Sequence, residues 1–166
     1  MLFRSYHQNN SNVNNDNNII FSNDMLLTDN GSTDINDDVK IETAGFLLFE
    51  FGSTQLYSYS KNDLKKVLLA LQKNKQLKIE LIGHADAIGR AGKNQILSLQ
   101  RANQIKQYLL DNSISQDRIK TYGKGENAPI AINNNVDGSD SPEGRKYNRR
   151  VDLRVLDPNE IGRAHV

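Results

Sequence analysis

Hydrophobic residues are scattered over the first forty-odd positions and become dense and periodic from Gly45 onward. The run 46–51 is almost entirely apolar and aromatic, which is typical of a short buried strand, and Gly52 ends it. Further along, apolar residues recur at the spacing i, i+3, i+4, i+7, which places them on one face of a helix. These residues are Leu64, Val67, Leu68 and Leu71. Ser60 is a favourable N-cap residue with Asp63 three positions later, and it predicts where this helix begins.

A second strand and a second helix follow. Residues 77–81 alternate between apolar and charged side chains, the pattern of a strand with one buried face. A helix is predicted to start near Lys93 or Asn94 and to run to about Asn112, because apolar residues again recur at helical spacing. The apolar stripe of this helix consists of Ile96, Leu99, Ala102, Ile105 and Leu109. Such a stripe is the face that a helix turns towards the core.

Two more strands complete the pattern. One is short, at 118–122, and the other alternates over 151–155 after a long polar loop at 133–144. The order β-α-β-α-β-β predicts an α/β (α+β sandwich) fold with two main helices packed on one mixed sheet of about four strands. Right-handed crossovers place both helices on one face of that sheet. The long loop leaves the direction of the last strand open.

The stretch before this pattern is rich in asparagine and aspartate. Between Tyr6 and Thr43 there are seven acidic residues and one lysine, a balance of −6. Such a composition buries too little apolar surface to offset chain entropy. We therefore predict that residues 6–44 are a linker or a truncated upstream region. Its short apolar patches, 19–21 and 25–27, could each form a strand or be remnants of an upstream domain.

Both ends of the chain look foreign. Residues 2–5 (Leu-Phe-Arg-Ser) and 161–164 (Ile-Gly-Arg-Ala) are what opposite strands of one sequencing adapter would encode. Our hypothesis is that residues 1–5 and the tail 158–166 are non-native and that the natural protein continues upstream of Ser5. The lack of an export signal at the start of the chain then says nothing about location.

The composition argues against several classes of function. The net charge of +1 provides no basic field for nucleic acid, and the absence of cysteine removes disulfides and thiolate metal sites. His84 and Asp86 could be two metal ligands, but a site needs three or four, so we expect no metal and no cofactor. Ser98 with His84 is the only conceivable nucleophile and base pair. His84 is better explained as packing or capping the strand end, so we expect a binding module and not an enzyme.

A candidate binding site lies where the second strand ends. Asp86 stands just past that strand, at the edge where open sheets favour ligands. Asn94 and Arg101 are seven positions apart on the next helix and share one face, with Ser98 near it. An acid and a planar guanidinium on two rigid elements suit a zwitterion, because the acid accepts an ammonium and the guanidinium donates two bonds to a carboxylate. Asn148-Arg149-Arg150 could add a second cation.

Considered singly, these residues have ordinary explanations. An aspartate at a strand end is usually a turn or cap residue, and an arginine on a helix usually faces solvent or pairs with a neighbour. The pattern of the whole stretch carries more information. It comprises Ile82-Gly83-His84-Ala85-Asp86, Gly89, Asn94, Leu97-Ser98, Arg101-Ala102, Tyr108-Leu109, Arg118, Gly123, Gly125, Pro129, Gly144 and Asn148-Arg149-Arg150-Val151.

With these residues at this spacing, residues 45–157 resemble the OmpA-like peptidoglycan-binding domain. The resemblance implies a periplasmic module that binds the diaminopimelate of the peptidoglycan stem peptide. It also implies that an upstream segment tethers the domain to the outer membrane. By the same resemblance Asp86 pairs with the ammonium, Arg101 with the carboxylate, Asn94 supports them, and Arg149 supplies a further cation. We expect the Asp86 and Arg101 side chains to reach outwards to the ligand.

The chain departs from the family pattern near the site. Ala85 replaces the usual threonine, and Ile88 brings an apolar group next to the site. Ala85, Ile88, Ser98, Asn148 and Arg150 are possible supporting residues. The alternative is a domain that has lost wall binding and serves as a protein-interaction or dimerisation module. The two differ in whether Asp86 and Arg101 share an open cleft or are buried against each other.

Overall fold

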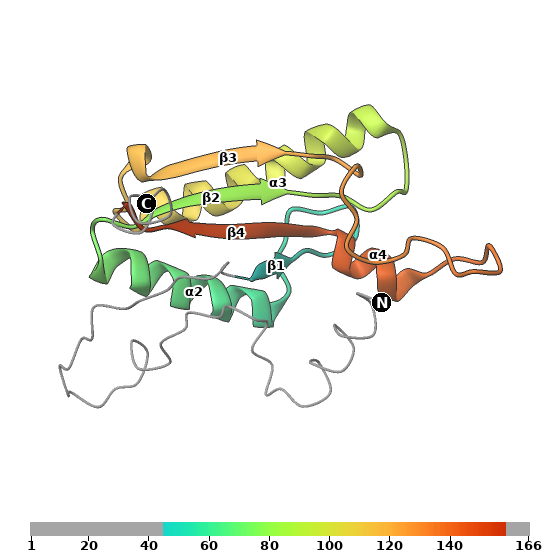
Figure 1. Ribbon diagram of the computed structural model, residues 1–166, viewed down its shortest axis with the longest axis horizontal. Helices are drawn as coiled ribbons and strands as arrows, with labels where there is room; N and C mark the ends of the chain where they lie inside the picture. Colours follow the sequence, from blue (N-terminus) through green and yellow to red (C-terminus); the bar gives the residue numbers. More distant parts are fainter. Residues whose placement is uncertain (1–44, 159–166) are drawn as a thin grey trace, which may run out of the picture.

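Four strands form one sheet in the computed structural model, which describes residues 45–158. The strands are β1 (Phe46–Leu48), β2 (Lys78–Gly83), β3 (Ile119–Gly123) and β4 (Arg150–Leu156). Their order in the sheet is β1-β4-β2-β3 (Figure 1). Strands β2 and β3 are parallel, and β4 runs antiparallel to both of its neighbours, β1 and β2. The mixed four-stranded sheet is therefore confirmed, and the last strand occupies an inner position. The predicted linker 6–44 and the predicted foreign ends lie outside the described residues, apart from Pro158.

Two long helices cover one face of this sheet. They are α2 (Ser58–Lys73) and α3 (Ala91–Asp111), and the inward residues of both belong to the same core cluster as alternate residues of the strands. Leu47, Leu81 and Leu153 are examples from the sheet, and each is at most 2% exposed. The placement of both helices on one face is thus confirmed. No helix of residues 45–158 combines the length and apolar character needed to cross a membrane.

The other face of the sheet is covered at one end by a helix that we did not predict. Helix α4 (Pro142–Asn148) begins inside the expected polar loop, with proline in its first turn, where the missing N–H is tolerated. Its Tyr147 packs with Phe46 and Leu48 of β1 in a second small cluster. A 3-10 turn, Gln116–Arg118, precedes β3.

The first helix begins earlier than the sequence indicated. It starts at Ser58, and Ser60 lies inside it without exposed surface. The Ser60 hydroxyl accepts a hydrogen bond of 2.9 Å from the backbone N–H of Leu48. Ser60 therefore ties α2 to β1 and does not cap the helix.

The apolar stripe predicted for the second helix is only half correct. Ala102, Ile105 and Leu109 are buried, but Ile96 is 60% exposed and Leu99 is 39% exposed. The first half of α3 instead turns polar residues inward: Asn94, Ser98 and Arg101. The reason is that this half lies against the ends of the strands and their loops, where backbone groups need hydrogen-bond partners.

Candidate functional site

The end of β2 lies almost in contact with the backbone of α3. A Cβ atom on Gly83 would fall 1.8 Å from the carbonyl oxygen of Ser98, so only glycine allows this approach. The hydroxyl of Ser98 accepts a hydrogen bond of 2.9 Å from the N–H of Gly125, which follows β3. These two contacts fix α3, the end of β2 and the loop after β3 relative to one another. Asp86 comes shortly after Gly83 in the sequence.

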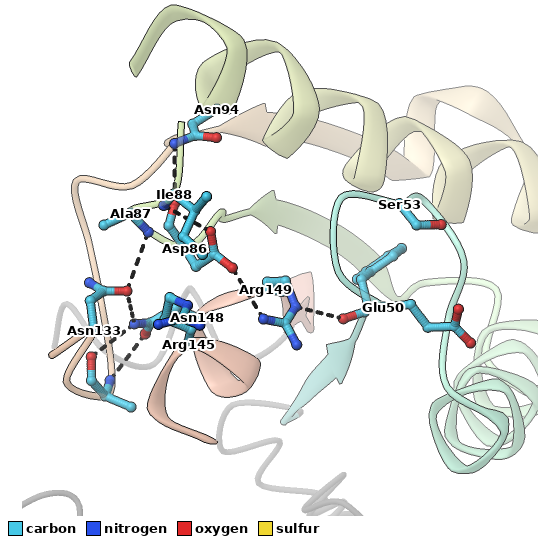
Figure 2. A network of polar contacts seen from close by, with 12 residues as sticks. Glu50, Ser53, Asp86, Ala87, Ile88, Asn94, Asn133, Arg145, Asn148 and Arg149 are labelled. Carbon is cyan, nitrogen blue, oxygen red and sulfur yellow. Dashed lines mark hydrogen bonds and ion pairs between the residues drawn. The ribbon is translucent and has the colours of Figure 1, made fainter. Parts of the chain in front are cut away.

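Asp86 is buried and already has a cationic partner. It is 5% exposed, and its carboxylate accepts a hydrogen bond from the N–H of Ile88 at 3.0 Å. The second carboxylate oxygen accepts from Nη1 of Arg149 at 3.1 Å (Figure 2). Arg149 is itself 7% exposed. The acid and the second cation of the predicted site therefore form a shielded ion pair.

Arg101 is fully buried, contrary to the expectation that it reaches outwards. Its guanidinium donates to three backbone carbonyls, those of Ser53 at 3.0 Å, His84 at 3.0 Å and Glu50 at 3.4 Å. It also lies 5.4 Å from the centre of the Phe49 ring. Arg101 thus holds the loop after β1 against the end of β2.

Burial also changes the acidity of Arg101. Loss of hydration lowers the pKa of its guanidinium to about 10; the negative charge of Asp86 opposes this shift, and the positive charge of Arg149 adds to it. The group is still protonated at neutral pH. The site therefore contains two cations and one acid that influence each other electrostatically.

Arg149 connects the ion pair to the loop after β1. Its Nε donates to the carbonyl of Phe49 at 3.3 Å, and its guanidinium lies 5.8 Å from the centre of the Phe51 ring. Phe51 is 63% exposed, and Ile88, whose N–H binds Asp86, is 44% exposed. Two exposed apolar side chains therefore accompany a buried ion pair at the surface of the site.

Asn94 supports the loop and not a side chain of the ion pair. Its amide donates to the carbonyl of Asp86 at 3.2 Å and to the carboxylate of Glu126 at 2.5 Å. The N–H of Ala85 donates to the carbonyl of Gly125 at 2.8 Å, and its side chain is buried. These contacts fix the backbone that carries Asp86.

The two residues that flank Arg149 have different surroundings. Asn148 is fully buried and accepts from the N–H groups of Ile130 and Ala131, so it anchors the preceding loop. Arg150 is on the opposite face of the sheet, where it donates to Asp152 at 2.7 Å and to the carbonyl of Ala128 at 3.1 Å. The structure therefore does not bring Arg150 to Asp86.

A second polar cluster occupies that opposite face. His84 is 3% exposed, and its Nε2 lies 2.9 Å from the carboxylate of Asp152. Burial alone would raise the pKa of Asp152, but the hydrogen bonds and positive charges of His84 and Arg150 hold it below its ordinary value. The side chain of His84 is thus buried against the carboxylate of Asp152 on this face. Within residues 45–158 no group of three His, Cys, Asp or Glu side chains could hold a metal ion.

Sequence reasoning missed the part of the site that comes from the loop after β1. Phe49, Glu50 and Ser53 provide carbonyl acceptors to the arginines, and Phe51 provides an exposed ring. Every residue has a backbone carbonyl, so the residue types do not indicate which carbonyls accept hydrogen bonds from the arginines. The one available signal was Phe51, an aromatic residue next to the glycine that ends the apolar run.

Comparisons with known proteins identify the family of this domain. The OmpA family model matches residues 48–149, more than half of the chain. Outer membrane protein A of Buchnera aphidicola subsp. Schizaphis graminum is 38% identical over 65% of this chain and 33% of its own length. The peptidoglycan-binding protein ArfA of Mycobacterium tuberculosis is 31% identical over 74% of this chain and 36% of its own length.

Solved structures show the same fold. The peptidoglycan-associated lipoprotein from Burkholderia pseudomallei matches with a TM-score of 0.58 and 21% identity, over 67% of this chain and 89% of that one. The chain spans at most 33% of the length of the first three curated relatives it matches. It therefore corresponds to one domain of those longer proteins.

Proposed function

Since the chain belongs to the OmpA family, we propose that residues 45–157 bind peptidoglycan non-covalently and anchor a longer envelope protein to the cell wall. The ligand group is the diaminopimelate of the stem peptide. The observation that carries the proposal is the ion pair between Asp86 and Arg149, with Arg101 near enough to interact electrostatically with both. Two of the matched proteins, ArfA and the peptidoglycan-associated lipoprotein, have names that support a role at the wall.

The proposed binding step is an exchange of ion pairs. Diaminopimelate presents an ammonium and a carboxylate on one carbon. Its ammonium takes the place of Arg149 at the carboxylate of Asp86, and its carboxylate accepts hydrogen bonds from the released Arg149. Arg101 keeps the loop in position and contributes positive potential, and Phe51 and Ile88 shield the new contacts from water.

The exchange also sets the strength of binding. Because one buried ion pair is replaced by two, the net gain is small, and the ligand loses freedom on binding. We expect a single-site dissociation constant on the order of micromolar to millimolar. Retention on the wall then comes from the many sites of the polymer. A periplasmic location and a tether to the outer membrane, through a segment upstream of this chain, belong to the same proposal.

The test is co-sedimentation with purified wall sacculi. We expect Asp86→Ala and Arg149→Ala to lose most of the bound fraction, because each leaves one ligand charge without a partner. Arg154→Ala is the matched control, since this arginine is exposed on β4 and pairs only loosely with Glu80 at 3.6 Å. Circular dichroism and thermal denaturation must show that each variant is folded.

The choice of wall tests the ligand group itself. Sacculi in which lysine replaces diaminopimelate keep the ammonium but lack the adjacent carboxylate. We expect the unmodified protein to bind diaminopimelate sacculi and to bind lysine sacculi weakly. Equal sedimentation with both walls would contradict the diaminopimelate proposal while leaving wall binding intact.

One observation favours a second candidate, a protein-interaction or dimerisation module. Asp86 and Arg149 already satisfy each other, and Arg101 is fully buried, so none of these three charged side chains is open to a ligand. If folded Asp86→Ala and Arg149→Ala proteins sediment with the wall as well as the parent, or if the parent does not sediment at all, this candidate replaces wall binding.

A further inference from the structure

A groove of about 560 Å³ lies between α2 and α3 on the side of the loop after β1. Buried apolar side chains, Leu64 and Ile105 among them, form its floor. Polar side chains, including Gln104 and Tyr108, line it from α3. The groove is separate from the ion pair at Asp86, and nothing in the proposed wall-binding step uses it.

The groove carries positive charge without compensation. Lys61 and Lys65 are four residues apart on α2, so their side chains lie on one face of the helix and both line the groove. None of the lining residues is acidic. Within residues 45–158, neither lysine forms an ion pair. Two adjacent ammonium groups over an apolar floor favour an occupant that is acidic and carries apolar side chains.

The chain itself contains such an occupant. Residues 16–42, here named the acidic segment, hold seven acidic residues and one lysine, a balance of −6. They also hold the two apolar patches 19–21 and 25–27. We infer that the acidic segment docks in the groove of the same molecule, with carboxylates at Lys61 and Lys65 and an apolar patch on the floor. This inference is independent of what the Asp86 site binds.

Tethering makes docking within one molecule the favoured case. The stretch from Asp29 to Gly45, fully extended, spans up to about 55 Å, which exceeds the diameter of about 35 Å expected for a domain of this size. The segment can therefore reach the groove from its point of attachment. A tethered ligand has an effective concentration on the order of millimolar, above that of any free acidic partner in a dilute solution.

The test is zero-length carbodiimide coupling of carboxylates to lysines in the full chain, followed by peptide mass spectrometry. We expect Lys61 and Lys65 to couple to the acidic segment about five-fold or more above the exposed controls Lys75 and Lys120. In about 1 M NaCl, where the Debye length is about 3 Å, the excess should disappear.

Two further arms decide between occupants. In a mixture of ¹⁵N-labelled and unlabelled chains, coupling within one molecule gives only unmixed products. Mixed products at about half of the total, the share expected for coupling between molecules in an equimolar mixture, would overturn docking within the molecule in favour of a second copy. Equal coupling of Lys61, Lys65 and the two control lysines would overturn the inference altogether.

A double variant, Lys61→Glu with Lys65→Glu, should show faster amide exchange across 16–42 than the matched Lys75→Glu with Lys120→Glu, and equal exchange would also overturn the inference.

Discussion

Arg101 is a buried cation whose hydrogen bonds within residues 45–158 go to backbone carbonyls and to no carboxylate. It donates to two acceptors in the loop after β1 and to one at the end of β2, as a neighbouring strand donates to carbonyls in a sheet. The acid of the site is held in a complementary way, by Arg149 and by the N–H of Ile88. At the scale of single residues, the groups that stabilise the fold are therefore also those of the proposed binding site.

Removal of the Arg101 side chain should destabilise the domain. Arg101→Ala removes the donor to three carbonyls, of which that of Glu50 keeps the N–H of Ser53 at 3.3 Å, and it opens a cavity beside Phe49. We expect a loss of about 3 kcal/mol in the free energy of unfolding. Arg101→Lys should also cost about 1–3 kcal/mol, because a single ammonium cannot span three acceptors. Urea denaturation measures both. The exposed Arg154→Ala should change the free energy by less than about 0.5 kcal/mol, and a similarly small effect at Arg101 would refute its structural role.

The elements of this fold could be predicted to different extents. Periodicity identified both long helices and strands β2 and β4, because each has a buried face whose spacing is visible in the sequence. Strand β1 was identified by its dense apolar run, and all three of its residues are buried. Helix α4 could not be identified, since only Tyr147 among its seven residues adds an apolar side chain to the cluster on β1. The burial of the polar residues in the first half of α3 could not be predicted either. Their hydrogen-bond partners are mainly backbone carbonyl and N–H groups, which every residue possesses. Asp86 could be singled out by its charge and its place after the second strand, and Arg149 only by the family resemblance, but their mutual contact depends on the inner position of β4.

The close approach of β2 and α3 gives a prediction at the scale of elements. Gly83→Ala would place a Cβ 1.8 Å from the Ser98 carbonyl, so the helix or the strand end must move. We expect a destabilisation of about 2–3 kcal/mol. The matched control is Gly92→Ala, also next to the site but with nothing within 4 Å of the new methyl group. This control should be neutral or stabilising by up to about 1 kcal/mol. Thermal or urea denaturation compares the two, and equal effects would contradict the close contact.

For the whole molecule, the core defines the folding unit. In the part of the chain that the structure describes, the buried apolar residues of the main cluster extend from Leu47 to Val155. We therefore expect a fragment of residues 45–158 to unfold cooperatively, with a free energy within about 1 kcal/mol of that of the full chain. Docking of the acidic segment is compatible with a difference of at most about 1 kcal/mol, because exposed ion pairs contribute little to the free energy of unfolding. A loss of several kcal/mol on removal of residues 1–44 would show that the folding unit extends further upstream.

The inner position of β4 also has a consequence for timing. Arg149, at its start, contacts Phe49 and Asp86, which are 100 and 63 positions earlier in the sequence. While a chain is synthesised or translocated from its N-terminus, β1 and β2 have no strand between them and the acid has no partner until this last strand emerges. Under the proposed function, competence for attachment is then an all-or-none property of the finished chain. A molecule stalled or cut before Arg149 would lack the proposed site, so selection for attachment would at the same time be selection for complete molecules.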